Sequence, residues 1–157
     1  MEHAVTPLHC GTITLDKSIL TTQVDSGVAV AAPSICYLIE GPSAAEPILV
    51  DTSFGDVDRM AELQPAFDCR RPHGHTVENR LNAHGYEVAD VETVVLTHLH
   101  WDHCYNLEGF EATADVRVSR AELEYAVAPY PMHAAGYDAK SLGREPPWLD
   151  VHLDPLE

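Results

Sequence analysis

One short segment of this sequence concentrates side chains that bind metal ions. Residues 97–103 read T-H-L-H-W-D-H, which places three of the ten histidines and one aspartate within six positions. Imidazole and carboxylate groups are preferred ligands of zinc and related divalent ions. The segment therefore predicts a metal site. Solvated or core histidines are a poorer interpretation, because burying several unpaired imidazoles is costly.

The spacing of these residues predicts how they are divided between ions. In extended backbone, alternate side chains point the same way, so His98, His100 and Asp102 share one face. The leucine and tryptophan between them then point into the core and anchor the segment. We expect His98 and His100 to chelate one ion. Asp102 and His103 are adjacent and diverge, so they reach a second ion more naturally.

The elements expected around this segment indicate an α/β or α+β protein, because strands and helices interleave along the chain. Strands are predicted at residues 11–15, 35–39, 48–51, 91–97 and 116–118 and around Val151, and helices at residues 56–63, 76–83 and 119–127. Gly41 and Pro42, followed by a short polar loop, predict that the second and third strands are antiparallel neighbours. Ser119 and Glu122 form an S-x-x-E capping-box pattern. Residues 66–75 are predicted to be a surface loop and residues 146–157 an acidic tail.

Composition excludes several classes of partner. With 25 acidic and 9 basic residues, the 157-residue chain has a formal net charge of −16, which argues against nucleic acid and against an anionic membrane surface. An acidic surface with only two lysines suits a protein that works in high salt, and an acidic protein of ordinary habitat is an equal alternative. No apolar run approaches the length of a membrane span. The N-terminal residues show no export signal, so we expect a cytoplasmic protein whose four cysteines are free thiols.

Several stretches together resemble one family of hydrolases. The T-H-L-H-W-D-H segment, preceded by the strand I-L-V-D-T at residues 48–52, is similar to the signature region of the metallo-β-lactamase superfamily. Residues 98–110 and the stretch E-L-E-Y-A at residues 122–126 resemble the N-acyl-homoserine-lactone lactonase branch. The resemblance extends from about Cys36 to Tyr137. It implies an αββα sandwich and a metal-dependent hydrolase that opens a lactone or ester.

The resemblance also implies roles for particular residues. His98 and His100 would bind a first metal, and Asp102 and His103 a second. The two ions, zinc or else manganese, iron or cobalt, would share the hydroxide that attacks the lactone carbonyl. Asp102 would also return a proton to the leaving alkoxide. Asp51 matches an aspartate that orients a ligand histidine, and a plain turn residue is the alternative.

Members of this family are usually longer than 157 residues. Their second half supplies a Pro-Gly-His-type histidine, a bridging aspartate and a fourth histidine, and no such motif follows His103. The chain therefore resembles the N-terminal half of a sandwich, one partial domain over residues 1–157. We expect one sheet face to be uncovered, a second copy of the chain to cover it, and this chain alone to lack turnover. Two alternatives stay open: a thioester or phosphoester hydrolase of the same fold, and a non-catalytic module that binds a metal or a partner.

Overall fold

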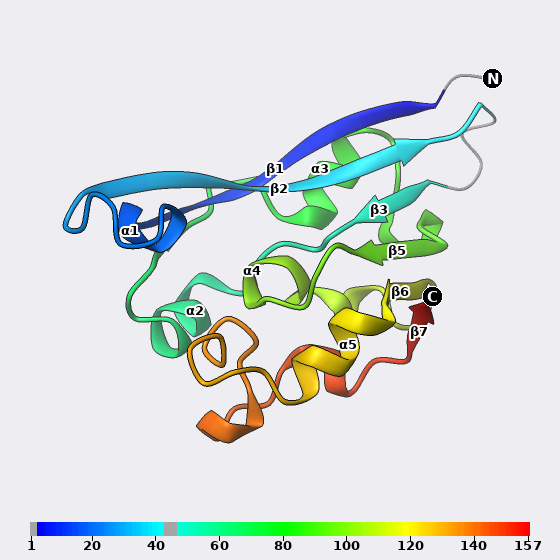
Figure 1. Cartoon of the computed structure of the whole chain (residues 1–157). Coiled ribbons are helices and arrows are strands. Elements are labelled where there is room, and N and C mark those ends of the chain that lie inside the picture. Colours follow the sequence, from blue (N-terminus) through cyan, green and yellow to red (C-terminus); the bar gives the residue numbers. More distant parts are fainter. Residues whose placement is uncertain (1–2, 43–46) are drawn as a thin grey trace.

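The computed structural model describes residues 3–42 and 47–157 and contains one seven-stranded sheet (Figure 1). Its strands are β1 (Ala4–Asp16), β2 (Ala29–Glu40), β3 (Ile48–Val50), β4 (Asp68–Arg70), β5 (Thr93–Leu96), β6 (Asp115–Ser119) and β7 (Leu153–Leu156). They are arranged in the order β4-β1-β2-β3-β5-β6-β7. The strands from β4 to β3 pair antiparallel, and those from β3 to β7 pair parallel. The predicted α/β class is confirmed.

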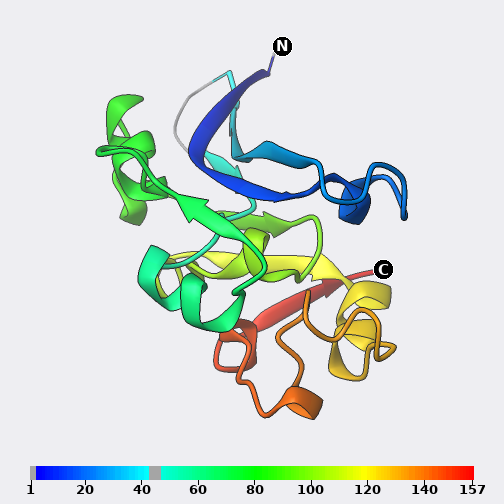
Figure 2. The same cartoon turned by 90° about the vertical axis from the view of Figure 1, so that its left-hand side faces the viewer.

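Short helices connect the strands. They are α1 (Lys17–Leu20), α2 (Val57–Leu63), α3 (Val77–Ala83), α4 (Trp101–Cys104) and α5 (Arg120–Val127), with 3-10 turns η1 (Val88–Asp90), η2 (Leu107–Gly109), η3 (Lys140–Leu142) and η4 (Pro147–Leu149). Figure 2 shows β1 and β2 curving along one side of the molecule, opposite the C-terminal strand β7. No helix among the described residues is long and apolar enough to cross a membrane.

The core lies on one face of the sheet, because buried side chains alternate along the strands. Leu38, Leu49, Val94 and Val116 follow one another across four neighbouring strands and are almost fully buried. They pack in one cluster with residues of α3 and α5. The opposite face carries Tyr37, whose side chain is exposed, and a row of partly buried aliphatic residues that belong to neither buried cluster. One sheet face is thus less well covered than the other.

Two helix starts follow from the side chains that cap them. The Asp56 carboxylate accepts hydrogen bonds from the amides of Asp58 and Arg59, and the Thr76 hydroxyl oxygen accepts one from the amide of Asn79. Such caps satisfy amides that the first helical turn leaves without partners. Both helices were predicted from the sequence, the second of them with Thr76 as its cap.

Three predictions about elements need correction. Residues 66–75 are not all loop, because 68–70 form β4, which pairs with β1. The last strand is not centred on Val151 but occupies β7, two residues later. Ser119 makes no side-chain capping bond at the start of α5, so the predicted capping box is absent, and its glutamate binds elsewhere. The polar loop predicted after Pro42 falls at residues 43–46, outside the described residues.

Candidate metal centre

The candidate site lies at the carboxyl ends of two parallel strands. Asp51 directly follows β3, and residues 97–103, called here the histidine loop, directly follow β5. Side chains at the carboxyl ends of neighbouring parallel strands meet at one edge of a sheet, where α/β proteins commonly bind ligands. A backbone hydrogen bond of 2.9 Å from the Asp51 amide to the Val95 carbonyl keeps the two strand ends together.

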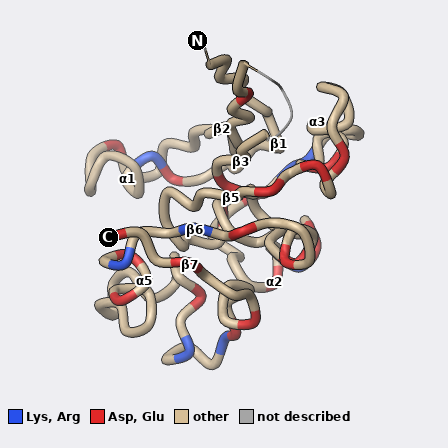
Figure 3. The backbone as a smooth tube through the Cα atoms, turned by 90° about the vertical axis from the view of Figure 1, so that its right-hand side faces the viewer, with Lys and Arg blue, Asp and Glu red and all other residues tan. Residues whose placement is uncertain are grey.

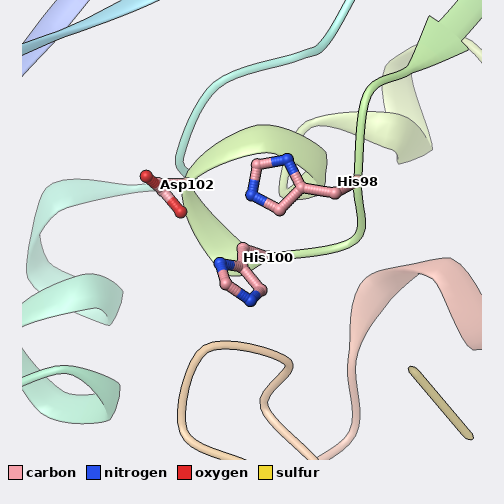
Figure 4. A group of neighbouring side chains, drawn as sticks. All are labelled: His98, His100 and Asp102. Carbon is pink, nitrogen blue, oxygen red and sulfur yellow. The ribbon is translucent and has the colours of Figure 1, made fainter. Parts of the chain in front are cut away.

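Three predicted ligands converge in this loop. The ligand atoms of His98, His100 and Asp102 all lie within 4.8 Å of one another. Figure 4 shows the two imidazoles and the carboxylate facing a common space. The loop is anchored by Leu99 and Trp101, which are 1% and 4% exposed, as the sequence predicted.

The backbone that brings these ligands together differs from the predicted extended strand. His100 is extended, with φ −69° and ψ 151°, but α4 begins at the next residue. Asp102 therefore reaches the two histidines from a helical turn and not from the alternation of a strand. The conformation is fixed from outside the loop, since the Trp101 amide donates to the Gly136 carbonyl at 2.9 Å.

His103 lies beside this group and faces two carboxylates. Its Nδ1 lies 2.8 Å from Asp51 Oδ2, and its Nε2 lies 3.5 Å from Asp102 Oδ2. Its ring also packs 4.0 Å from the ring of His98. A carboxylate can only accept, so Nδ1 carries the proton and Nε2 remains directed toward the site. This is the contact expected of an aspartate that orients a ligand histidine.

Asp51 also organises His98, through a residue that the sequence did not single out. The Thr97 hydroxyl lies 2.8 and 3.0 Å from the two Asp51 oxygens and 3.1 Å from His98 Nδ1. Because the carboxylate accepts the hydroxyl proton, the hydroxyl oxygen is left to accept from His98 Nδ1. Asp51 is itself 4% exposed and has a φ of 61°. One buried carboxylate thus leaves the Nε2 atoms of two histidines available as ligands.

Burial sets the charge state of the imidazoles. It lowers the pKa of His98, and the neighbouring His103 lowers it further. Burial, followed by the neighbouring His98, lowers the pKa of His100 to about 4. For His103, burial acts downward, but the hydrogen bond to Asp51 and the charges of Asp102 and Asp51 together raise the pKa. Neutral His98 and His100 offer the lone pairs that a divalent cation requires.

The chemistry of these donors fits a divalent metal ion. Two neutral imidazoles and a carboxylate meet at ligand distance, and a third imidazole is oriented by a hydrogen bond to its other nitrogen. Such hydrogen bonds are typical of histidines that bind metals. How the four residues are divided between one ion and two stays a prediction.

A cavity of about 530 Å³ opens beside His100 and Asp102. Its apolar wall is formed by Ile13, Leu15, Ile19, Leu20, Phe67 and Trp101. Met132 and His133 also line the cavity, and Met132 is 82% exposed. The site therefore combines a polar end with an apolar trough.

Gly136 is a feature of the site that the sequence did not reveal. A Cβ at this position would lie 3.0 Å from His100 Nε2, closer than such contacts ordinarily are. A side chain at this position would force the imidazole to move by a few tenths of an ångström. The next residue, Tyr137, packs its ring edge-on against His100 at 4.4 Å. Neither contact has a local sequence signal, because the segment is far from the histidine loop along the chain.

Comparison with known proteins places these observations in a family. A model of the metallo-beta-lactamase superfamily matches residues 30–157. The N-acyl homoserine lactonase of Bacillus cereus is 30% identical over 125 residues, covering 74% of this chain and 48% of that protein. The ribonuclease Z of Salinibacter ruber is 38% identical over 63 residues, covering 40% of this chain and 18% of that protein.

A crystal structure provides an independent comparison of the fold. A mutant of Bacillus thuringiensis AiiA with N-decanoyl-L-homoserine at its active site superposes with a TM-score of 0.74 and 23% identity, covering 98% of this chain and 59% of that one. The chain thus spans less than half the length of the two curated relatives. Because the family model matches most of the sequence and the fold agrees, the chain belongs to the metallo-β-lactamase superfamily.

Proposed function

We propose that the site formed by His98, His100, Asp102 and His103 serves a metal-dependent hydrolase that opens lactone rings of the N-acyl-homoserine-lactone type. The observation that carries the proposal is the convergence of three ligand atoms within 4.8 Å, beside an apolar cavity of about 530 Å³. The similarity to an N-acyl homoserine lactonase at 30% identity supports the substrate class.

The residues have distinct tasks in this proposal. His98 and His100 hold one divalent ion and Asp102 and His103 the other, with zinc as the expected metal and manganese, iron or cobalt as substitutes. Bound there, the metal supplies Lewis-acid polarisation of the carbonyl and acidifies a water molecule. Asp51 keeps the proton of two histidines on Nδ1, so that Nε2 is free to bind the metal. It acts directly on His103 and through the Thr97 hydroxyl on His98.

Asp102 has a second task, at the leaving group. Its side chain is 31% exposed and lines the cavity. In this proposal the Asp102 carboxylate accepts the proton that the attacking water releases and then returns it to the alkoxide formed when the ring opens. The apolar trough holds an acyl chain and excludes water from it, which fixes the lactone carbonyl near the ligands.

Phosphoester hydrolysis is a second candidate, favoured by the 38% identity to a ribonuclease Z over 63 residues. The net charge of −16 argues against a polyanionic substrate, since phosphate contacts need clustered lysine and arginine.

We also propose a cytoplasmic location. The four buried cysteines are free, which supports it.

We further propose that a second copy of the chain covers the sheet face that carries Tyr37. The exposure of this face supports such a pairing.

A substrate panel tests the proposed class. The zinc-loaded chain is titrated with an N-decanoyl homoserine lactone, a decanoyl thioester and an aryl phosphodiester, and both binding and hydrolysis are measured. We expect the lactone to bind most tightly, and any hydrolysis to follow the same order. Preference for the phosphodiester would favour the second candidate. Metal binding without preference among the three would instead support a non-catalytic module.

A further inference from the structure

We propose that Glu122 is a positioning residue that holds the histidine loop in its ligand geometry from helix α5. Glu122 acts on the backbone amide of Leu99, between the two histidine ligands. It rests on the proposed metal site for its functional meaning, but the contact itself can be tested without metal.

The contact joins two elements that are distant in sequence. Glu122 Oε1 accepts a hydrogen bond from the Leu99 amide at 2.9 Å. Leu99 lies between His98 and His100, and its side chain is 1% exposed. The residue is therefore held on two sides, by the core through its side chain and by Glu122 through its backbone. Hydrogen bonds to a charged acceptor are stronger than neutral ones, so this bond fixes the separation of the two imidazoles.

A second contact extends the same support to His100. The Tyr137 hydroxyl lies near the Glu122 carboxylate, and the Tyr137 ring packs edge-on against His100 with 4.4 Å between ring centroids. Burial, followed by the nearby Glu122 carboxylate, raises the pKa of the Tyr137 hydroxyl, which therefore stays protonated at neutral pH. One carboxylate thus connects the backbone before His100 with the aromatic ring beside it.

The absence of local capping by Glu122 agrees with this role. In a capping box, the glutamate at this position turns back to the amide of the N-cap residue. Here the N-cap Ser119 forms no side-chain capping bond, and Glu122 instead reaches across to the loop after β5. A residue whose pattern predicts a local role has therefore become a link between α5 and the candidate site.

Two variants and a control separate positioning from general stability. In Glu122→Gln the amide oxygen can still accept from Leu99, whereas in Glu122→Ala no acceptor remains. Glu124→Ala is the control, since it removes the same charge from an exposed position of the same helix. Amide exchange at Leu99 is followed by NMR in the metal-free chain, and Co²⁺ affinity is followed by visible absorption.

We expect Glu122→Ala to accelerate exchange at the Leu99 amide about tenfold or more and to weaken Co²⁺ binding about 10- to 100-fold. Glu122→Gln keeps one acceptor oxygen for the Leu99 amide and should lose less than the alanine variant in both measurements, while the control should stay near the original chain. If the alanine variant does not fold, Glu122→Asp takes its place, because its shorter side chain cannot reach Leu99. Unchanged exchange in the alanine or aspartate variant, or equal losses in the alanine and glutamine variants, would overturn the proposal. If the original chain binds no Co²⁺, the proposed function fails, while exchange at Leu99 still decides the contact.

Discussion

At the scale of single residues, the candidate site depends on the control of imidazole tautomers by one buried carboxylate. Asp51 receives hydrogen bonds from the Thr97 backbone and hydroxyl and from His103 Nδ1. Its φ of 61° is uncommon for a non-glycine residue, although aspartate tolerates this region better than most. The surrounding bonds offset that cost and fix which nitrogen of each imidazole faces the site.

Gly136 provides the most direct steric prediction. We expect Gly136→Ala to weaken Zn²⁺ or Co²⁺ binding about tenfold, because the added Cβ would lie 3.0 Å from His100 Nε2. Calorimetric titration measures the change. Gly109→Ala is the matched control, since a Cβ added there would meet nothing within 4 Å and the φ of this residue is not positive. Equal metal affinities in the two variants would show that metal binding at His100 does not depend on the space that Gly136 leaves beside its Nε2.

His100 predicts a pH dependence of stability in the metal-free chain. Its folded-state pKa of about 4 lies below the ordinary value of 6.5, so the unfolded chain binds this proton first as the pH falls. The free energy of unfolding should therefore decrease from about pH 6.5 to about pH 4, by about 3 kcal/mol for this group. Urea unfolding of the original chain and of His100→Gln measures the difference. The raised pKa of His103 acts in the opposite direction, so a comparison of the two chains isolates His100. Parallel pH profiles would contradict the prediction.

The sequence predicted the candidate ligands but not the residues that support them. The T-H-L-H-W-D-H spacing marks the ligands because they are neighbours along the chain. Thr97, Glu122, Gly136 and Tyr137 act through contacts that form only when distant segments meet. A single sequence has no local signal for such contacts.

At the scale of elements, most strands and helices followed from local patterns, and the exceptions have physical causes. The helix after Thr76 was predicted from its cap, the helix after Asp56 from the stretch that ends before Pro65, and the antiparallel pairing of β2 with β3 from its turn residues. β4 was missed because its three residues, two of them charged, form a strand only by pairing with β1. α4 was missed because four residues are too few for helical periodicity.

A buried polar network holds the segment that carries Gly136 against the site. Asp138 is 1% exposed and accepts hydrogen bonds from Tyr105 Oη, from Gln64 Nε2 at 2.8 Å and from Arg144 Nη1 at 2.6 Å. Gln64 also donates to the Ala135 carbonyl at 2.9 Å. This network connects the end of α2 and the residue after α4 with the segment before η3.

We expect Asp138→Ala to lower the free energy of unfolding by about 3 kcal/mol, since it leaves buried donors, one of them charged, without their acceptor. The exposed Asp150→Ala, in the same part of the chain, should change it by less than about 0.5 kcal/mol. Chemical denaturation measures both changes. A loss below about 1 kcal/mol in the first variant would show that the network does not stabilise this segment.

At the scale of the whole molecule, acidic side chains dominate the surface. Figure 3 shows aspartate and glutamate spread over many elements, with lysine and arginine at few positions. The formal net charge of −16 destabilises the folded state through self-repulsion, which dissolved ions screen. This charge is independent of the fold and bears on the conditions under which the protein is most stable.

Salt should therefore stabilise the chain. We expect the melting temperature to rise steadily between about 0.01 M and 1 M KCl, a range over which the screening length falls from about 30 Å to about 3 Å. Thermal unfolding followed by circular dichroism measures it. Maximal stability at the lowest salt concentration would contradict the prediction and with it the interpretation of the acidic surface as an adaptation to salt.

If His98, His100, Asp102 and His103 bind divalent metal, the amount of metal bound per chain must depend on them. Zinc is added to the metal-free chain, unbound zinc is removed by dialysis, and bound zinc is measured by elemental analysis. We expect at least one tightly held equivalent in the original chain, and its loss in His98→Ala and His100→Ala while both variants keep the fold. Absence of bound zinc in the original chain, or undiminished binding in the two variants, would contradict it.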